Sequence, residues 1–194
     1  LRGRILCREA QVLAAQKKPP ADAKQKIQEK YRAALDVFRL AQGKDTVSNR
    51  ATQQAIYLSG MCHVELGEMK EAMADFTRAT SLFPNTPEGM ASAFQEGQVA
   101  RKLGQDAVAM TAYQRALACL ADPEMANNPW LPIREFRVSM AAACQDYLAA
   151  KKYAFAMKLI LLASFFITSF LLVFLFFNLQ QDTTTIVRER LKRL

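Results

Sequence analysis

From Gly60 to Pro84 the chain reads GMCHVELGEMKEAMADFTRATSLFP. This stretch has the residue pattern of two short helices joined by a tight turn. Gly67 supplies the turn, and a small residue on each helix lets the two backbones approach closely. Phe76 fills the space between the helices, and Pro84 ends the second helix because it has no backbone N–H to donate. The small and aromatic positions are Gly60, Gly67, Ala72, Phe76 and Ala79. The stretch therefore predicts a helical hairpin.

The same arrangement of small and aromatic residues returns 37 residues further along the chain. Because five positions with the same steric role match at a single shift, we interpret the pattern as an internal repeat. Repeats of this length stack into a helical solenoid. A degenerate first repeat precedes them, with its turn lengthened around Pro19 and Pro20. The matching positions are Gly97, Gly104, Ala109, Tyr113 and Ala116 in the later copy, and Ala34, Phe38 and Ala41 in the degenerate one.

At these residues the chain resembles the tetratricopeptide-repeat family, over about residues 53–84 and 90–121. The resemblance implies an all-α solenoid of about three to four helical hairpins. The first helices of such hairpins line a concave groove that binds a protein or peptide ligand. It implies no catalytic activity, no cofactor and no small-molecule substrate. The junction from Pro84 to Glu88 is similar to the variety found in bacterial envelope proteins, so we expect a protein of the bacterial cell envelope.

Start and stop signals place the helices of the repeats. In the motif Thr86-Pro87-Glu88, the threonine can cap a helix, the proline suits its first position, and the glutamate complements the positive end of the helix dipole. The motif and its repeat predict helices over 88–103 and 106–120. Other start signals are Asp22, for a helix that ends near Gln42, and Ser48 or Asp45, for the helix that contains Gly60.

A fourth hairpin follows an insertion loop, whose three prolines and two asparagines are expected to keep it out of a helix. In this hairpin Cys144 occupies the position of Gly60, and Lys151 replaces the turn glycine. Ile160 occupies the position of Phe76. The expected segments are a degenerate hairpin (1–50), two well-matched repeats (51–121), the insertion loop (122–132), the fourth hairpin (133–158), a transmembrane helix (159–179) and a short basic tail (180–194).

The C-terminal run from Leu159 to Phe177 has 19 residues and no charge, and fifteen of them are Leu, Ile, Val or Phe. A helix of this length spans about 28 Å, close to the roughly 30 Å thickness of a bilayer's hydrocarbon. We therefore predict a single-pass membrane helix that contacts the lipid bilayer. A fully buried solenoid helix is the alternative. Three lysines precede the run and four basic residues follow it in the tail, so the charges do not decide the orientation.

The net charge of +8 is unevenly distributed. Residues 51–130 hold nine acidic and five basic residues, whereas both ends of the chain are basic. A nucleic-acid-binding protein is expected to carry a continuous basic stripe, so we expect no nucleic-acid partner, and anionic lipid is the simpler explanation of the basic ends. The only histidine and the four scattered cysteines have no metal-site spacing. No nucleophile–base pair stands in a supporting context, so we expect no enzyme.

Three polar or thiol residues inside the helical patterns are interpreted mainly as packing residues. Cys62 and Cys144 lie where a small apolar residue would pack, so core packing is the main interpretation and a disulfide or redox role is the alternative. His63 stands where the family usually has a tyrosine between paired helices, and we expect it to be a packing residue.

The groove that the resemblance implies would be lined by the first helix of each hairpin. Apolar side chains there offer adaptable contacts, and adjacent cations offer charge for an acidic group. An ordinary solvated surface without a specific ligand is the alternative. The candidate partner-binding residues are Tyr57, Met61, Glu65, Phe94, Gln98, Arg101 and Lys102. Trp130, the only tryptophan, either pins the insertion loop onto the solenoid or anchors a partner.

The leading hypothesis is a membrane-anchored scaffold that mediates protein–protein or peptide interaction through its groove. The alternative is a sensor and transmission fragment of a larger membrane signalling protein.

Overall fold

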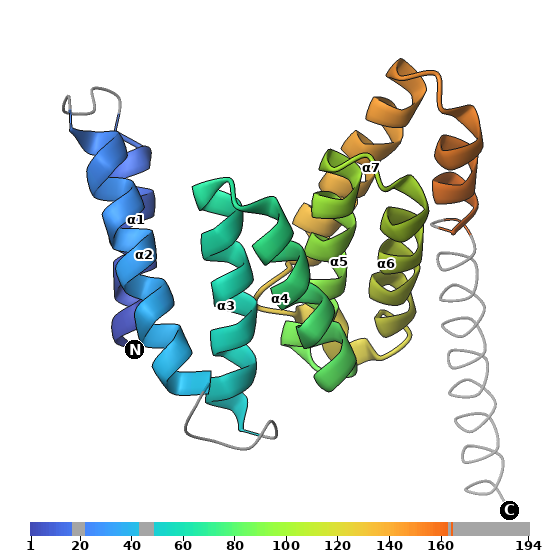
Figure 1. The fold of residues 1–194 in the computed structure, drawn as a ribbon. Coiled ribbons are helices and arrows are strands. Elements are labelled where there is room, and N and C mark those ends of the chain that lie inside the picture. Colours follow the sequence, from blue (N-terminus) through green and yellow to red (C-terminus); the bar gives the residue numbers. More distant parts are fainter. Residues whose placement is uncertain (17–21, 43–48, 163, 165–194) are drawn as a thin grey trace, which may run out of the picture. The chain divides into compact units, whose positions relative to one another are not determined.

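The computed structural model describes residues 1–16, 22–42, 49–162 and 164. The described residues form helices and connecting turns, with no strand among them, which confirms the all-α prediction (Figure 1). Two compact units divide the chain after Val138. The helices are α1 (Arg2–Ala14), α2 (Ala23–Gln42), α3 (Arg50–Leu66), α4 (Met69–Leu82), α5 (Pro87–Lys102), α6 (Asp106–Cys119), the 3₁₀ helix η1 (Pro123–Asn127) and α7 (Ile133–Ala149).

Three consecutive helical hairpins build the first unit. Helix α1 packs against α2, α3 against α4, and α5 against α6, as Figure 1 shows in blue, blue-green and green. Neighbouring hairpins join through contacts of α2 with α3 and of α4 with α5, and the first helices α3 and α5 also touch. This pattern of contacts between successive hairpins is the one expected of a helical solenoid.

Each hairpin of the first unit is held by an aromatic ring against a glycine. A Cβ atom on Gly60 would lie 2.5 Å from Cε1 of Phe76, and one on Gly97 would lie 2.5 Å from Cε1 of Tyr113. Only glycine therefore lets these helices approach so closely. Both rings are 0% exposed, which confirms that they occupy equivalent core positions. The sequence pattern did not reveal the third pair, in which Gly3 makes the same approach to the ring of Phe38.

The hairpin turns share one backbone conformation, including the turn in which lysine replaces glycine. Gly67, Gly104 and Lys151 have φ angles of 78°, 73° and 57°. In each turn the next residue donates its N–H to a carbonyl five residues earlier, as in the 2.9 Å bond from Glu68 to His63. Such a helix end favours glycine, and the prediction that Lys151 takes its place is confirmed.

The helix starts are partly as predicted. Thr86 accepts a 3.0 Å hydrogen bond from the N–H of Gly89, and Pro87 opens α5, as the motif indicated. The prediction that Ser48 or Asp45 opens α3 is wrong, because the side chain of Asn49 is the cap and accepts a 2.9 Å bond from the N–H of Ala51.

The insertion loop is not devoid of helix. Residues Pro123–Asn127 form the 3₁₀ helix η1. Asp122 caps this helix by accepting a 2.9 Å bond from the N–H of Glu124. Proline is compatible with such a turn because it stands at the first helical position, where no N–H is needed. The expectation that the loop contains no helix was therefore wrong.

The second unit begins within α7 and includes a helical segment at 153–162. The ring of Tyr147 stacks on that of Phe155 at a centroid distance of 5.7 Å. Ile160, which aligns with Phe76, is 53% exposed, whereas Leu159 is 2% exposed. Ile160 therefore does not take the place of the core ring. Cys144, at the position of the glycine, instead contacts the carbonyl oxygen of Ala156 through its Sγ at 3.9 Å.

The predicted membrane segment falls largely outside the described residues. Only 159–162 and 164 of the run from Leu159 to Phe177 are described, and the tail 180–194 is not. Within the part of the chain that the structure describes, no helix combines the length and the apolar character needed to cross a bilayer.

Candidate functional site

The predicted partner-binding residues come from two helices that pack side by side, α3 and α5. They occupy equivalent positions, since each residue of α3 is matched by one of α5 that lies 37 residues later. Tyr57 corresponds to Phe94, Met61 to Gln98, and Glu65 to Lys102. Residues spaced by four, seven or eight positions share one face of a helix, so each helix presents one row of these side chains.

The aromatic members of the set are core residues. Tyr57 is 4% exposed and Phe94 is 3% exposed. The ring of Tyr57 lies 6.2 Å from that of Phe76, and Phe94 lies 6.0 Å from Tyr113 and 5.2 Å from Phe136. Burial raises the pKa of Tyr57 above its usual range. Direct binding of a partner to these two rings would first require the surrounding side chains to move.

The segment 122–132, called here the Trp130 loop, lies against α3 and the start of α5. The indole Nε1 of Trp130 donates a 3.0 Å hydrogen bond to Oε1 of Glu88, which is itself 2% exposed. The Trp130 ring lies 5.3 Å from that of Tyr57, and the guanidinium of Arg4 lies 5.4 Å from the indole ring. The side chain of Asn128 donates a 2.8 Å bond to the carbonyl of Pro87. These contacts match the interpretation that Trp130 pins the loop to the solenoid; the alternative, an anchor for a partner, stays a prediction.

Beyond the aromatic pair, the remaining members of the set lie on the second halves of α3 and α5 and are accessible. Glu65 and Lys102 are exposed, and the other members are partly exposed. Arg101 donates a 3.0 Å hydrogen bond through Nη2 to Oε1 of Gln98, which orients both side chains. The α3/α5 face, as we define it, consists of Met61, Val64, Glu65, Gln98, Arg101 and Lys102. It combines apolar side chains and a carboxylate on α3 with two cations on α5.

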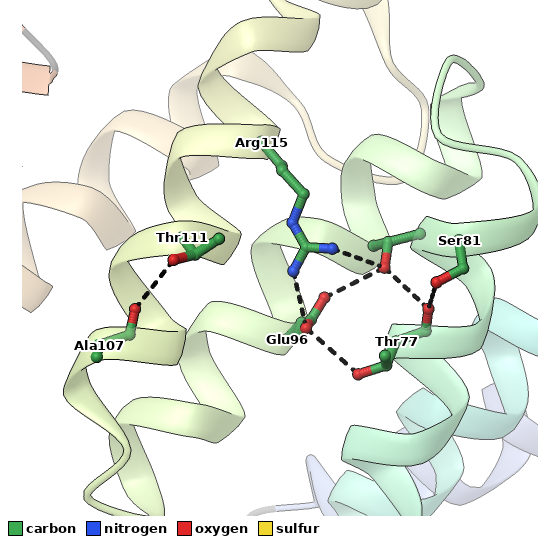
Figure 2. A network of polar contacts seen from close by, with 7 residues as sticks. Thr77, Ser81, Glu96, Ala107, Thr111 and Arg115 are labelled. Atoms are coloured by element: carbon green, nitrogen blue, oxygen red, sulfur yellow. Dashed lines mark hydrogen bonds and ion pairs between the residues drawn. The ribbon is translucent and has the colours of Figure 1, made fainter.

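A second polar cluster joins the hairpins around the buried carboxylate of Glu96 in α5 (Figure 2). Nη2 of Arg115 donates a 2.9 Å bond to Oε1 of Glu96, and Nη1 donates a 3.2 Å bond to Oγ1 of Thr80. The hydroxyls of Thr80 and Thr77 each donate a 3.3 Å bond to the same carboxylate. The cluster therefore ties α4, α5 and α6 together.

Two positions of this cluster, those of Arg115 and Glu96, take part in a weaker contact one repeat earlier, which Gln42 bridges. Arg78, which precedes Arg115 by 37 residues, donates a 3.0 Å bond through Nη1 to Oε1 of Gln42. Gln42 in turn donates a 3.0 Å bond to the hydroxyl of Ser59, which stands 37 residues before Glu96. The contact between neighbouring hairpins is thus repeated, but only the later copy contains a charged pair.

Replacement of Arg115 by methionine is expected to lower the free energy of unfolding by about 1.5–3 kcal/mol, the range for hydrogen bonds to charged groups. The side chain of Glu96 is 4% exposed, so its carboxylate would lose the cationic partner Arg115 in a poorly hydrated place, although Arg115 itself is 43% exposed. Arg78→Met, the matched control, removes a bond to a neutral amide and should cost about 0.5–1.5 kcal/mol. Urea unfolding followed by circular dichroism measures both values.

A double variant tests the origin of the Arg115→Met effect. Adding Glu96→Gln to Arg115→Met removes the uncompensated charge and should recover part of the loss, whereas Glu96→Gln alone should destabilise the protein. If Arg115→Met and Arg78→Met lower the free energy of unfolding equally, or if the double variant is no more stable than Arg115→Met, the charged pair adds no stability to the contact.

The described residues contain no group of three side chains arranged to hold a metal ion. His63 acts as a polar contact at its turn: Nδ1 lies 2.7 Å from Oε2 of Glu68, and Nε2 lies 3.8 Å from Oδ2 of Asp75. Burial raises the pKa of Asp75 above its usual range. His63 thus links α3, the turn and α4 through polar atoms, in addition to the packing role that was predicted.

Comparison with known proteins agrees with the internal repeat. Residues 53–86 match the family model of the tetratricopeptide repeat. The matched segment contains nearly all of the α3/α4 hairpin, including the pair formed by Gly60 and Phe76. No curated protein matches the chain.

Proposed function

We propose that this tetratricopeptide-repeat protein is a membrane-anchored scaffold that binds a protein or peptide segment on its α3/α5 face. The observation that carries the proposal is the division of the predicted site into two parts. Tyr57 and Phe94 are buried beneath other side chains of the chain itself, whereas the α3/α5 face on the second halves of the same helices is partly or fully exposed. Repeats of this family are interaction modules, which supports a protein or peptide as the ligand.

The chemistry of the α3/α5 face favours an acidic segment with an apolar side chain. Arg101 and Lys102 place two cations at the end of α5, where they can pair with carboxylates of a ligand. Met61 and Val64, both partly exposed, offer an apolar surface on α3, and methionine adapts to differently shaped side chains. We therefore propose a ligand with at least one carboxylate and one apolar anchor.

Charge reversal at Lys102 tests this site with little risk to the fold, because the side chain is exposed. Lys102→Glu should weaken the binding of acidic peptides about fivefold, since a charge at the edge of an interface contributes about 1 kcal/mol. Isothermal titration or fluorescence anisotropy measures the affinity. Met61→Ala, added to Lys102→Glu, should weaken the binding of the peptide further.

The matched control is Lys70→Glu, which makes the same charge change at an exposed position of α4. It should leave the affinity unchanged apart from a small long-range effect that salt removes. Equal losses in Lys102→Glu and Lys70→Glu would show that net charge, and not the α3/α5 face, attracts the ligand.

The membrane anchor is proposed from the sequence alone. The uncharged run from Leu159 to Phe177 and the basic residues on both sides support a single-pass helix, and the junction at Pro84–Glu88 supports a bacterial envelope protein. Such an anchor would tether the scaffold to a membrane.

A further inference from the structure

Two cysteines that are far apart in the sequence meet in the first unit. Cys7 lies on α1 and Cys62 on α3, and their Sγ atoms are 3.3 Å apart. Cys62 is 1% exposed and belongs to a cluster of buried residues that includes Tyr31 and Phe38, and Cys7 packs against this cluster from its partly exposed edge. Neither cysteine of the pair contributes to the α3/α5 face.

The two thiols have different surroundings. The hydrogen bond from Cys62 lowers the pKa of Cys7, whereas the same contact, together with burial, raises the pKa of Cys62. Since the thiolate is the nucleophile in thiol chemistry, Cys7 is the attacking group. It is also the more accessible thiol of the pair. Cys62 is then placed to react with whatever has bonded to Cys7.

We propose that Cys7 and Cys62 form a reversible disulfide by exchange with a small oxidised disulfide such as glutathione disulfide. In the first step the Cys7 thiolate attacks one sulfur of the reagent, its S–S bond breaks, and one glutathione leaves as a thiolate that takes up a proton. In the second step Cys62 loses its proton and attacks the Cys7 sulfur, which releases the second glutathione. The protein loses two electrons and two protons, and the reagent gains them.

The geometry favours this bond because little movement is needed. A disulfide requires the sulfurs to approach to about 2.05 Å, so the 3.3 Å pair must close by little more than 1 Å. The bond would join α1 to α3 and thereby fix the first hairpin to the second. Arg4, one helical turn before Cys7, lies over Trp130, so the same bond would hold α1 beside the Trp130 loop.

The test treats the full chain in detergent with glutathione disulfide, then unfolds it in denaturant and alkylates the remaining thiols, so that buried thiols are counted as well. Intact mass and peptide mapping should show the joint loss of two alkylatable thiols, with Cys7 bonded to Cys62 and with Cys119 and Cys144 still alkylated. Reduction with dithiothreitol should make all four cysteine thiols available to the alkylating reagent again. A lasting glutathione adduct on Cys7, or oxidation of Cys119 or Cys144 at the same rate, would overturn the proposal.

Single variants separate the two steps. Cys62→Ala should stop the reaction at a stable adduct between glutathione and Cys7. Cys7→Ser should leave Cys62 unmodified, because that thiol is buried. Cys119→Ser is the matched control: this partly buried thiol contacts the carbonyl of Pro84 and should not alter the yield of the Cys7–Cys62 bond. Glutathione addition to Cys62 in Cys7→Ser would contradict the proposed order of attack.

Discussion

Replacement of Phe76 by alanine is expected to lower the free energy of unfolding by about 3–5 kcal/mol, as for other fully buried aromatic side chains. The ring is 0% exposed and fills the space between α3 and α4, directly against Gly60. Because Gly60 has no side chain, it cannot fill the cavity that the ring leaves. In a solenoid each hairpin contacts only its neighbours. Removal of the Phe76 ring should therefore also weaken the contacts of α3 and α4 with the adjoining hairpins.

A second substitution makes this expectation sharper. Gly60→Ala alone should destabilise the protein, because the new Cβ would lie 2.5 Å from Cε1 of Phe76. The same change in the Phe76→Ala background should stabilise the protein, since the clash is gone and alanine is favoured over glycine in a helix by about 1 kcal/mol. The effect of Gly60→Ala should therefore change sign.

Denaturant unfolding of the four proteins in this cycle measures the sign change. Leu82→Ala is the matched control on α4, because this side chain is 42% exposed and its removal should change stability by no more than about 0.5 kcal/mol. A cost below about 1 kcal/mol for Phe76→Ala would be too small for a fully buried ring. An effect of Gly60→Ala that is the same in both backgrounds would show that the ring and the glycine do not constrain each other.

The repeated hairpins were predictable because their determinants are local in sequence. Gly60 and Phe76 are 16 residues apart, as are Gly97 and Tyr113, so a single shift reveals both pairs. The turn at Lys151 was also predictable, because the neighbouring pattern fixes the position of the turn even where the residue is not glycine. The pair of Gly3 with Phe38 was not predictable, because a longer connection separates these two residues by 35 positions.

The candidate site was less predictable because its environment depends on distant segments. Spacing alone placed Tyr57 on the first helix of its hairpin, but could not show that Trp130 would lie 5.3 Å away. Glu88 was interpreted only as a helix-start residue, although it also accepts the hydrogen bond of the indole. The one available signal was the 37-residue shift, which also relates Arg78 to Arg115 and could have indicated a repeated contact between hairpins.

Substitution of Phe170 and Leu171 by arginine is expected to release the full chain from membranes. These residues lie near the centre of the uncharged run in the sequence, where each arginine costs about 2.5–3.5 kcal/mol of insertion free energy. The fifteen large apolar residues of the run contribute roughly −4 to −9 kcal/mol, at about −0.3 to −0.6 kcal/mol each. Two arginines therefore offset most of the driving force for insertion. Removal of residues 159–194 should have the same result.

The polar residues of the run need not prevent insertion, because a hydroxyl can bond to a carbonyl of its own helix. Ser164, one of the few described residues of the run, donates such a 2.9 Å bond to the carbonyl of Leu161. Carbonate extraction of membranes followed by immunoblotting separates the outcomes: the intact chain should stay in the pellet and the double-arginine variant should enter the supernatant. The matched control places the two arginines at Asn178 and Gln180, just beyond the run, and should stay in the pellet. Recovery of the intact chain in the supernatant would instead favour a run that is buried against protein, because only an inserted helix resists carbonate.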